Sequence, residues 1–183
     1  MHHYYKVEAI VLKRINVGEA DRIVTVFTRH QGKLRLMAKG VRKITSKRAP
    51  HLEVFTRTYL HIAQGRNLDI ITEANTIEHF SRLRTELSRA LTAFGLAEEI
   101  ERLCGESQES QRIFQLLLFA LKKLNDDISL DIGQLSMQVS LEILWELGYL
   151  PKEVLLQQTE IKSFVESVLE RKLKSQFLDV GIV

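Results

Sequence analysis

The sequence predicts an α+β protein in which a five-stranded β-barrel over residues 1–80 precedes an all-α helical bundle over residues 81–183. Two observations predict this class. Up to about residue 80 the apolar residues recur mostly with the period of strands, and beyond it they recur at the helical spacings of three and four. The charge changes at the same place: residues 1–80 hold 14 Lys and Arg against 7 Asp and Glu, a net charge of +7, whereas residues 81–183 hold 12 against 16, a net charge of −4.

The first half contains five candidate strands, separated by residues that favour turns. They cover residues 5–12, 22–28, 33–39, 53–62 and 68–76. In the third strand Leu34, Leu36 and Ala38 alternate with polar or charged neighbours, so these three side chains should point inward. Gly32, in the turn before it, is expected to adopt a positive φ. Five strands in about 75 residues match the size of a small closed Greek-key barrel.

The second half contains four candidate helices. Asp131, followed three residues later by Gln134, indicates the start of the third helix, which should end at Gly148. That helix is apolar nearly all round and is therefore expected at the centre of the bundle. Thr159 is expected to cap the fourth helix.

Composition excludes several classes of protein. With 45% hydrophobic and 27% charged residues the chain should fold into a soluble protein. No apolar run reaches the roughly 18 residues of a membrane span, and the first residues do not resemble a signal peptide, so a cytoplasmic location is expected. The single cysteine, Cys104, excludes an internal disulfide and a multi-cysteine metal site, and the six histidines show no metal-ligand spacing. We therefore expect no metal, no cofactor and no catalytic constellation.

The stretch 39–48 is the most informative part of the chain. It contains five cations and no acid, and it connects two strands at the mouth of the expected barrel. Cations in such a loop can neutralise phosphates and release counterions, whereas the alternative is a solvated loop that aids solubility. The residues expected to contact phosphates are Lys33, Arg35, Lys39, Arg42, Lys43, Lys47 and Arg48.

The strand that follows supplies candidate aromatic contacts. If Thr56, Thr58 and Leu60 face inward, the other face carries Phe55, Arg57, Tyr59 and His61. Rings that alternate with cations are typical of single-strand binders, because any base can stack on a ring. We expect Tyr59, and with it Phe55, to stack and Arg57 to bind phosphate; the alternative is that the rings pack against the helices.

Several segments resemble the bacterial RecO family of recombinational DNA repair proteins. They are residues 18–28 (GEADRIVTVFT), 30–33 (HQGK), 38–40 (AKG), 141–149 (LEILWELGY) and 160–173. The resemblance covers nearly the whole chain. It implies an OB-fold barrel with a helical domain, and binding of single-stranded and double-stranded DNA with annealing of strands. It also implies a partnership with RecR and with the C-terminal tail of single-strand-binding protein in loading recombinase.

The chain departs from this family in one respect. Many relatives carry a four-cysteine zinc module soon after the Leu-Gly-Tyr segment, and a chain with Cys104 alone cannot form it. The chain is therefore expected to be a minimal member or a shortened one.

Two questions stay open at the level of sequence. An RNA-binding OB module with a helical interaction domain, or a scaffold whose basic loop meets an acidic protein, would show the same charges and aromatics. For a carboxylate-tipped partner peptide, the candidate contacts are Arg82, Arg89 and Arg112, with Lys122 and Lys123 on another helix. The alternative is that these are surface cations paired with Glu86, Glu109 or water.

Overall fold

The structure is a computed structural model, and it describes residues 3–169. The chain forms two compact units. The first contains residues up to His79 together with Gly105–Phe114, and the second contains Phe80–Cys104 together with the chain from Gln115 onward. The sequence assigned residues 105–114 to the helical half, but the structure places them with the barrel.

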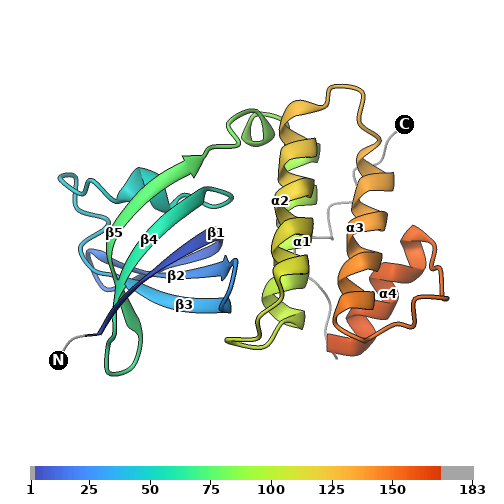
Figure 1. Ribbon diagram of the computed structural model, residues 1–183. Helices are drawn as coiled ribbons and strands as arrows, with labels where there is room; N and C mark the ends of the chain where they lie inside the picture. Colours follow the sequence, from blue (N-terminus) through green and yellow to red (C-terminus); the bar gives the residue numbers. More distant parts are fainter. Residues whose placement is uncertain (1–2, 170–183) are drawn as a thin grey trace. The chain divides into compact units, whose positions relative to one another are not determined.

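The first unit is a closed five-stranded barrel, in which neighbouring strands follow the order β1-β2-β3-β5-β4 (Figure 1). Its strands are β1 (Tyr4–Val17), β2 (Asp21–Thr28), β3 (Gly32–Ala38), β4 (Arg57–Ala63) and β5 (Asp69–Glu78). All neighbouring strands pair antiparallel except β3 and β5, which pair in parallel at Leu36 with Asp69 and Met37 with Ile70. The predicted α+β class and five-stranded barrel are confirmed.

The barrel core is built from the inward positions of all five strands. Leu36 and Ala38 are buried, and Leu34 packs against the same cluster, as the alternation predicted. The cluster consists of Val7, Ala9, Val11, Val24, Val26, Leu36, Ala38, Val41, Leu52, Leu60, Ile62, Ile71 and Ala74. Gly32 has the expected positive φ of 64°.

Two strand boundaries differ from the prediction. The first strand continues to Val17, because its pairing with β2 extends through the residues expected to form a turn. The fourth strand begins only at Arg57, because a 3₁₀ helix (Ala49–Leu52) and a left-handed residue at Phe55 occupy the chain before it.

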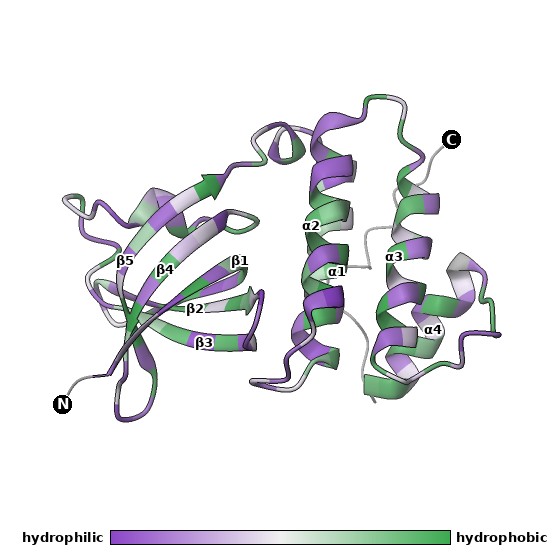
Figure 2. Ribbon diagram, viewed as in Figure 1, coloured by the Kyte–Doolittle hydropathy of each residue, from purple (hydrophilic) through white to green (hydrophobic). Residues whose placement is uncertain are grey.

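The second unit contains the helices α1 (Leu87–Leu103), most of α2 (Gln111–Asp126), α3 (Ile132–Glu146) and α4 (Gln158–Leu169), preceded by a 3₁₀ turn (Arg82–Arg84). Helix α3 packs against α1 and α4, and hydrophilic and hydrophobic bands alternate along α2 (Figure 2).

The helix ends confirm one predicted cap and correct another. Asp131 accepts the Gln134 N–H at 2.9 Å and starts α3, which ends before Gly148 at a φ of 75°. The fourth helix begins one residue before Thr159, and the side chain of Glu160 instead accepts the Gln157 N–H at 2.7 Å. The family-like segment 160–173 extends beyond the described residues.

Candidate nucleic-acid interface

The basic loop, residues 39–48, leaves the end of β3 and is tied to the turn between β1 and β2. Gly40 has a φ of 65°, and its N–H donates to Asp21 Oδ1 at 2.6 Å. The N–H of Arg42 donates to the carbonyl oxygen of Ala20 at 2.9 Å. These bonds hold the loop in a defined shape on the barrel.

Two of the expected phosphate-binding arginines also brace this loop. The Arg42 guanidinium donates to the carbonyl oxygen of Gly18 at 3.0 Å. Half-buried Arg48 donates to the carbonyl oxygens of Lys39, at 2.6 Å, and of Ile71 in β5. Since these donors are already used, fewer N–H groups remain for a phosphate. Arg48 therefore acts as a tie between the basic loop and β5.

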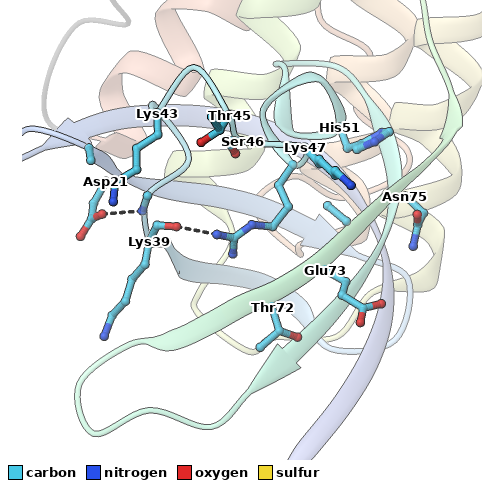
Figure 3. Close-up of a pocket in the computed structure, with 14 residues that line it drawn as sticks. Asp21, Lys39, Lys43, Thr45, Ser46, Lys47, His51, Thr72, Glu73 and Asn75 are labelled. Carbon is cyan, nitrogen blue, oxygen red and sulfur yellow. Dashed lines mark hydrogen bonds between the residues drawn. The ribbon is translucent and has the colours of Figure 1, made fainter.

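Beside the basic loop the surface of the barrel unit is hollowed over about 1050 Å³ (Figure 3). We call this site the basic hollow, and it is lined by Ala20, Asp21, Lys39, Gly40, Lys43, Thr45, Ser46, Lys47, Arg48, His51, Thr72, Glu73, Ala74 and Asn75. Four cations thus face two carboxylates, and the Asp21 carboxylate is engaged by the Gly40 N–H. Lys39, Lys43 and Lys47 are exposed, so the hollow favours an anionic ligand.

The hollow also contains neutral polar groups that the sequence analysis did not single out. His51 Nδ1 accepts the Thr76 N–H at 3.3 Å and lies 2.8 Å from Thr76 Oγ1. The Asn75 amide is exposed on β5. Such groups can bond to phosphate oxygens or base edges. No local pattern reveals them, because His51 and Asn75 meet only through the fold.

Lys33 and Arg35 lie outside the basic hollow, on β3. The segment Gly105–Phe114 runs beside this strand: the Ser107 N–H donates to the Lys33 carbonyl oxygen at 3.0 Å, and a parallel bridge pairs Lys33 with Glu106. Glu106 Oε1 lies 3.9 Å from Arg35 Nη1. The role of these two cations in phosphate binding stays a prediction, and the geometry separates them from the cations of the basic loop.

Arg57 and Tyr59 occupy β4 and differ in availability. The Arg57 guanidinium pairs with Glu8 at 2.6 Å and with Glu78 at 3.3 Å, and 20% of its side chain is exposed. Tyr59 is 46% exposed and lies opposite Asn75 in the strand register. Because Asn75 lines the basic hollow, Tyr59 lies beside that site and its ring is accessible, whereas Arg57 is engaged in ion pairs.

Phe55 is not placed for stacking, contrary to the prediction. Its side chain is 2% exposed and its φ is 66°. The N–H of Phe55 donates to the carbonyl oxygen of Val11 at 2.8 Å. The left-handed conformation interrupts the alternation on which the prediction depended, and the ring is therefore buried.

The ion pairs around Glu8 define its protonation. Burial alone would raise the pKa of this carboxyl, but hydrogen bonds from Arg57 and Arg29 and the two positive charges outweigh burial. The pKa of Glu8 consequently lies below its ordinary value, and the group is ionised at neutral pH.

Two of the expected peptide-binding arginines, Arg89 and Arg112, belong to different units and differ in exposure. Arg89 is 4% exposed, and its guanidinium donates to Glu86 and to the carbonyl oxygens of Leu124 and Asp127, both at 2.8 Å. It ties α1 to the end of α2 and is not available to a partner. Arg112 is exposed, and it belongs to the barrel unit.

The described residues offer neither a metal centre nor a membrane span. Among residues 3–169, His, Cys, Asp and Glu nowhere gather in groups of three or more that could hold a metal ion. Within the same described range, every helix is too short or too polar to cross a membrane.

The fold and the site together define a class of protein, in which an OB-like β-barrel with a basic hollow is joined to a helical unit. A family model described as "Recombination protein O N terminal" matches residues 1–80. The chain is 42% identical over 148 residues to the DNA repair protein RecO of Roseiflexus sp., a match that covers 81% of this chain and 51% of that protein. It is 45% identical over 120 residues to the DNA repair protein RecO of Nocardioides sp., covering 64% of this chain and 49% of that protein.

A third relative, the DNA repair protein RecO of Pelotomaculum thermopropionicum, is 35% identical over 147 residues, which cover 80% of this chain and 56% of that protein. The chain belongs to the RecO family. It spans about half the length of the curated relatives that it matches.

Proposed function

We propose that this chain is a non-enzymatic, DNA-binding mediator of recombinational repair. In this proposal it binds single-stranded and double-stranded DNA, anneals strands, and helps to load recombinase together with RecR and single-strand-binding protein. The relatives that it matches are named as DNA repair proteins, which supports the biological role. The observation that carries the proposal is the basic hollow, with four cations beside a braced loop.

In this proposal, different residues beside the basic hollow contact the phosphates and the bases. The exposed ammonium groups of Lys39, Lys43 and Lys47 neutralise consecutive phosphates of one strand. Tyr59, across β5 from the basic loop, stacks on a base of the same strand. Phosphate contacts position a strand and carry no sequence information, so binding is tolerant of sequence.

The test is a titration of a labelled single-stranded oligodeoxynucleotide, with fluorescence anisotropy measured at increasing salt. Three phosphate contacts predict a slope of about −2 for the logarithm of affinity against the logarithm of salt, because each contact on single strands contributes about 0.7. Absence of binding at low salt would overturn the proposal and favour a scaffold that uses its loop on an acidic protein. Tighter binding of a matched RNA strand would favour an RNA-binding module.

The same proposal extends to the partner peptide. With Arg89 engaged inside the helical unit, Arg112 is the expected arginine contact for the terminal carboxylate of single-strand-binding protein. Reversing the charge with Arg112→Glu should abolish binding of that C-terminal peptide while leaving oligonucleotide affinity within about twofold, as expected for sites without shared contacts. Peptide binding that survives the reversal would remove Arg112 from the proposal.

A further inference from the structure

Ile44 is the most exposed large hydrophobic residue that the described part of the chain contains. Its side chain has a relative exposure of 105%, compared with 76% for Ile128 and Leu155. Single exposed apolar residues are ordinary on protein surfaces, so exposure by itself assigns no role. The setting of Ile44, at the tip of the basic loop, is what distinguishes it.

Hydrogen bonds on both sides of Ile44 close the tip into a turn. The N–H of Lys43 donates to the Gly40 carbonyl oxygen at 3.2 Å, and the N–H of Ser46 donates to the Lys43 carbonyl oxygen at 2.9 Å. Farther along, Arg48 ties the base of the loop to β5. Ile44 is β-branched and therefore has few side-chain rotamers. The loop thus presents a stiff apolar group to solvent.

Cations flank this group on both sides along the chain. Lys43 and Lys47 line the basic hollow, whereas Ile44 lies outside its lining. In a strand with its phosphates on these two lysines, the base between those phosphates is the one that can turn toward exposed Ile44 at the loop tip. An unpaired base exposes an apolar ring face, and packing that face against an apolar side chain removes both from water.

We propose that Ile44 is a base-contacting wedge, which packs against the face of an unpaired base while Lys43 and Lys47 hold the adjoining phosphates. This inference rests on the proposed function and adds a determinant of specificity to it. The faces of paired bases are covered by their neighbours in a duplex, so the contact favours single strands over duplex DNA.

The experiment compares Ile44→Ser with the wild type and with Ile77→Ser, a matched change at another exposed isoleucine of the barrel unit, on β5. Two oligodeoxynucleotides of equal length serve as probes, one with normal bases and one with abasic sites at every position in its central half. A lost base contact should weaken binding of Ile44→Ser to the base-bearing strand by about three- to tenfold. The same variant should bind the abasic strand as the wild type does, with an unchanged salt slope, and Ile44→Phe should restore affinity.

The outcomes separate the wedge from the proposed function. Undiminished binding of Ile44→Ser to the base-bearing strand would overturn the wedge alone. An equal loss on the abasic strand, or in Ile77→Ser, would also overturn it, because the effect would then not come from a base contact at the tip. A wild-type protein that binds neither strand would overturn the proposed function and the wedge with it. Because Ile44 is fully exposed, its variants should melt at the wild-type temperature.

Discussion

At the scale of single residues, the cations of the basic loop differ in how their donors are used. Arg48 and Arg42 bond to backbone carbonyl oxygens of the barrel unit, so part of their role is to shape the loop. Lys43 and Lys47 are exposed and line the basic hollow. The sequence shows that five cations lie close together in the chain. It does not show which of them donate hydrogen bonds to backbone carbonyl oxygens of the barrel unit. Recognising the bracing cations needs the positions of the carbonyl groups that they bond, and those of Gly18 and Ile71 are more than 20 residues away in the chain.

This difference predicts unequal effects on stability for two neighbouring substitutions. Arg48→Ala removes charge-assisted hydrogen bonds to two carbonyl groups and should lower the free energy of unfolding by about 1.5 to 3 kcal/mol. Lys47→Ala removes an exposed ammonium group and should change it by no more than about 0.5 kcal/mol. Urea denaturation measures both, and equal values for the two variants would show that Arg48 is not a tie.

The ionised Glu8 predicts a dependence of stability on pH. Because hydrogen bonds from Arg57 and Arg29 lower its pKa in the folded state, ionised Glu8 stabilises the fold at pH values above its unfolded pKa of about 4.3. This contribution is lost as the pH falls through the lower folded-state pKa. Between neutral pH and pH 3 the melting temperature of the wild type should therefore fall more than that of Glu8→Gln. Parallel curves for the two proteins would contradict the ion-pair assignment.

At the scale of elements, the contact between β3 and the segment Gly105–Phe114 was not predicted from the sequence. Alternation identified β3 and its inward residues correctly, because a period of two is a local property. The bridge from Lys33 to Glu106 joins residues far apart in the chain, and no local pattern indicates it. Phe55 shows the converse case, since one left-handed residue overrode a regular alternation.

The segment Gly105–Phe114 passes so close to Gly32 that no side chain fits there. A Cβ atom at Gly32 would lie 2.0 Å from the carbonyl oxygen of Gln108, and the φ of 64° disfavours any other residue. Gly18 has a similar φ of 56°, but a Cβ atom there would meet nothing within 4 Å.

The two glycines are therefore a matched pair for substitution. Gly18→Ala should cost about 1 to 2 kcal/mol of unfolding free energy for the left-handed conformation alone. Gly32→Ala should cost more, since it also displaces the backbone of the segment Gly105–Phe114. Equal losses in the two variants, measured by urea denaturation, would mean that the segment yields without cost.

At the scale of the whole molecule, the charge is divided between the two parts of the chain. Residues 1–80 have a net charge of +7, and residues 81–183 have a net charge of −4. This division predicts an anion site in the first part of the chain, and the lining of the basic hollow lies within residues 20–75. The division could not reveal where on the barrel unit the cations meet. Lys39, Lys43 and Lys47 share the hollow, whereas Lys33 and Arg35 lie beside the acidic Glu106.

The measurement that tests the central claim most directly compares two double variants that each remove two cations. One is Lys43→Ala with Lys47→Ala, from the basic hollow, and the other is Lys33→Ala with Arg35→Ala, from β3. Affinity for a labelled single-stranded oligodeoxynucleotide is measured for both across a range of salt concentrations. The account predicts that the hollow variant loses about 1.4 units of salt slope, from two contacts of about 0.7 each, while the β3 variant keeps most of the wild-type slope and affinity. An unchanged slope in the hollow variant, or a larger loss in the β3 variant, would contradict the claim that the basic hollow holds the strand.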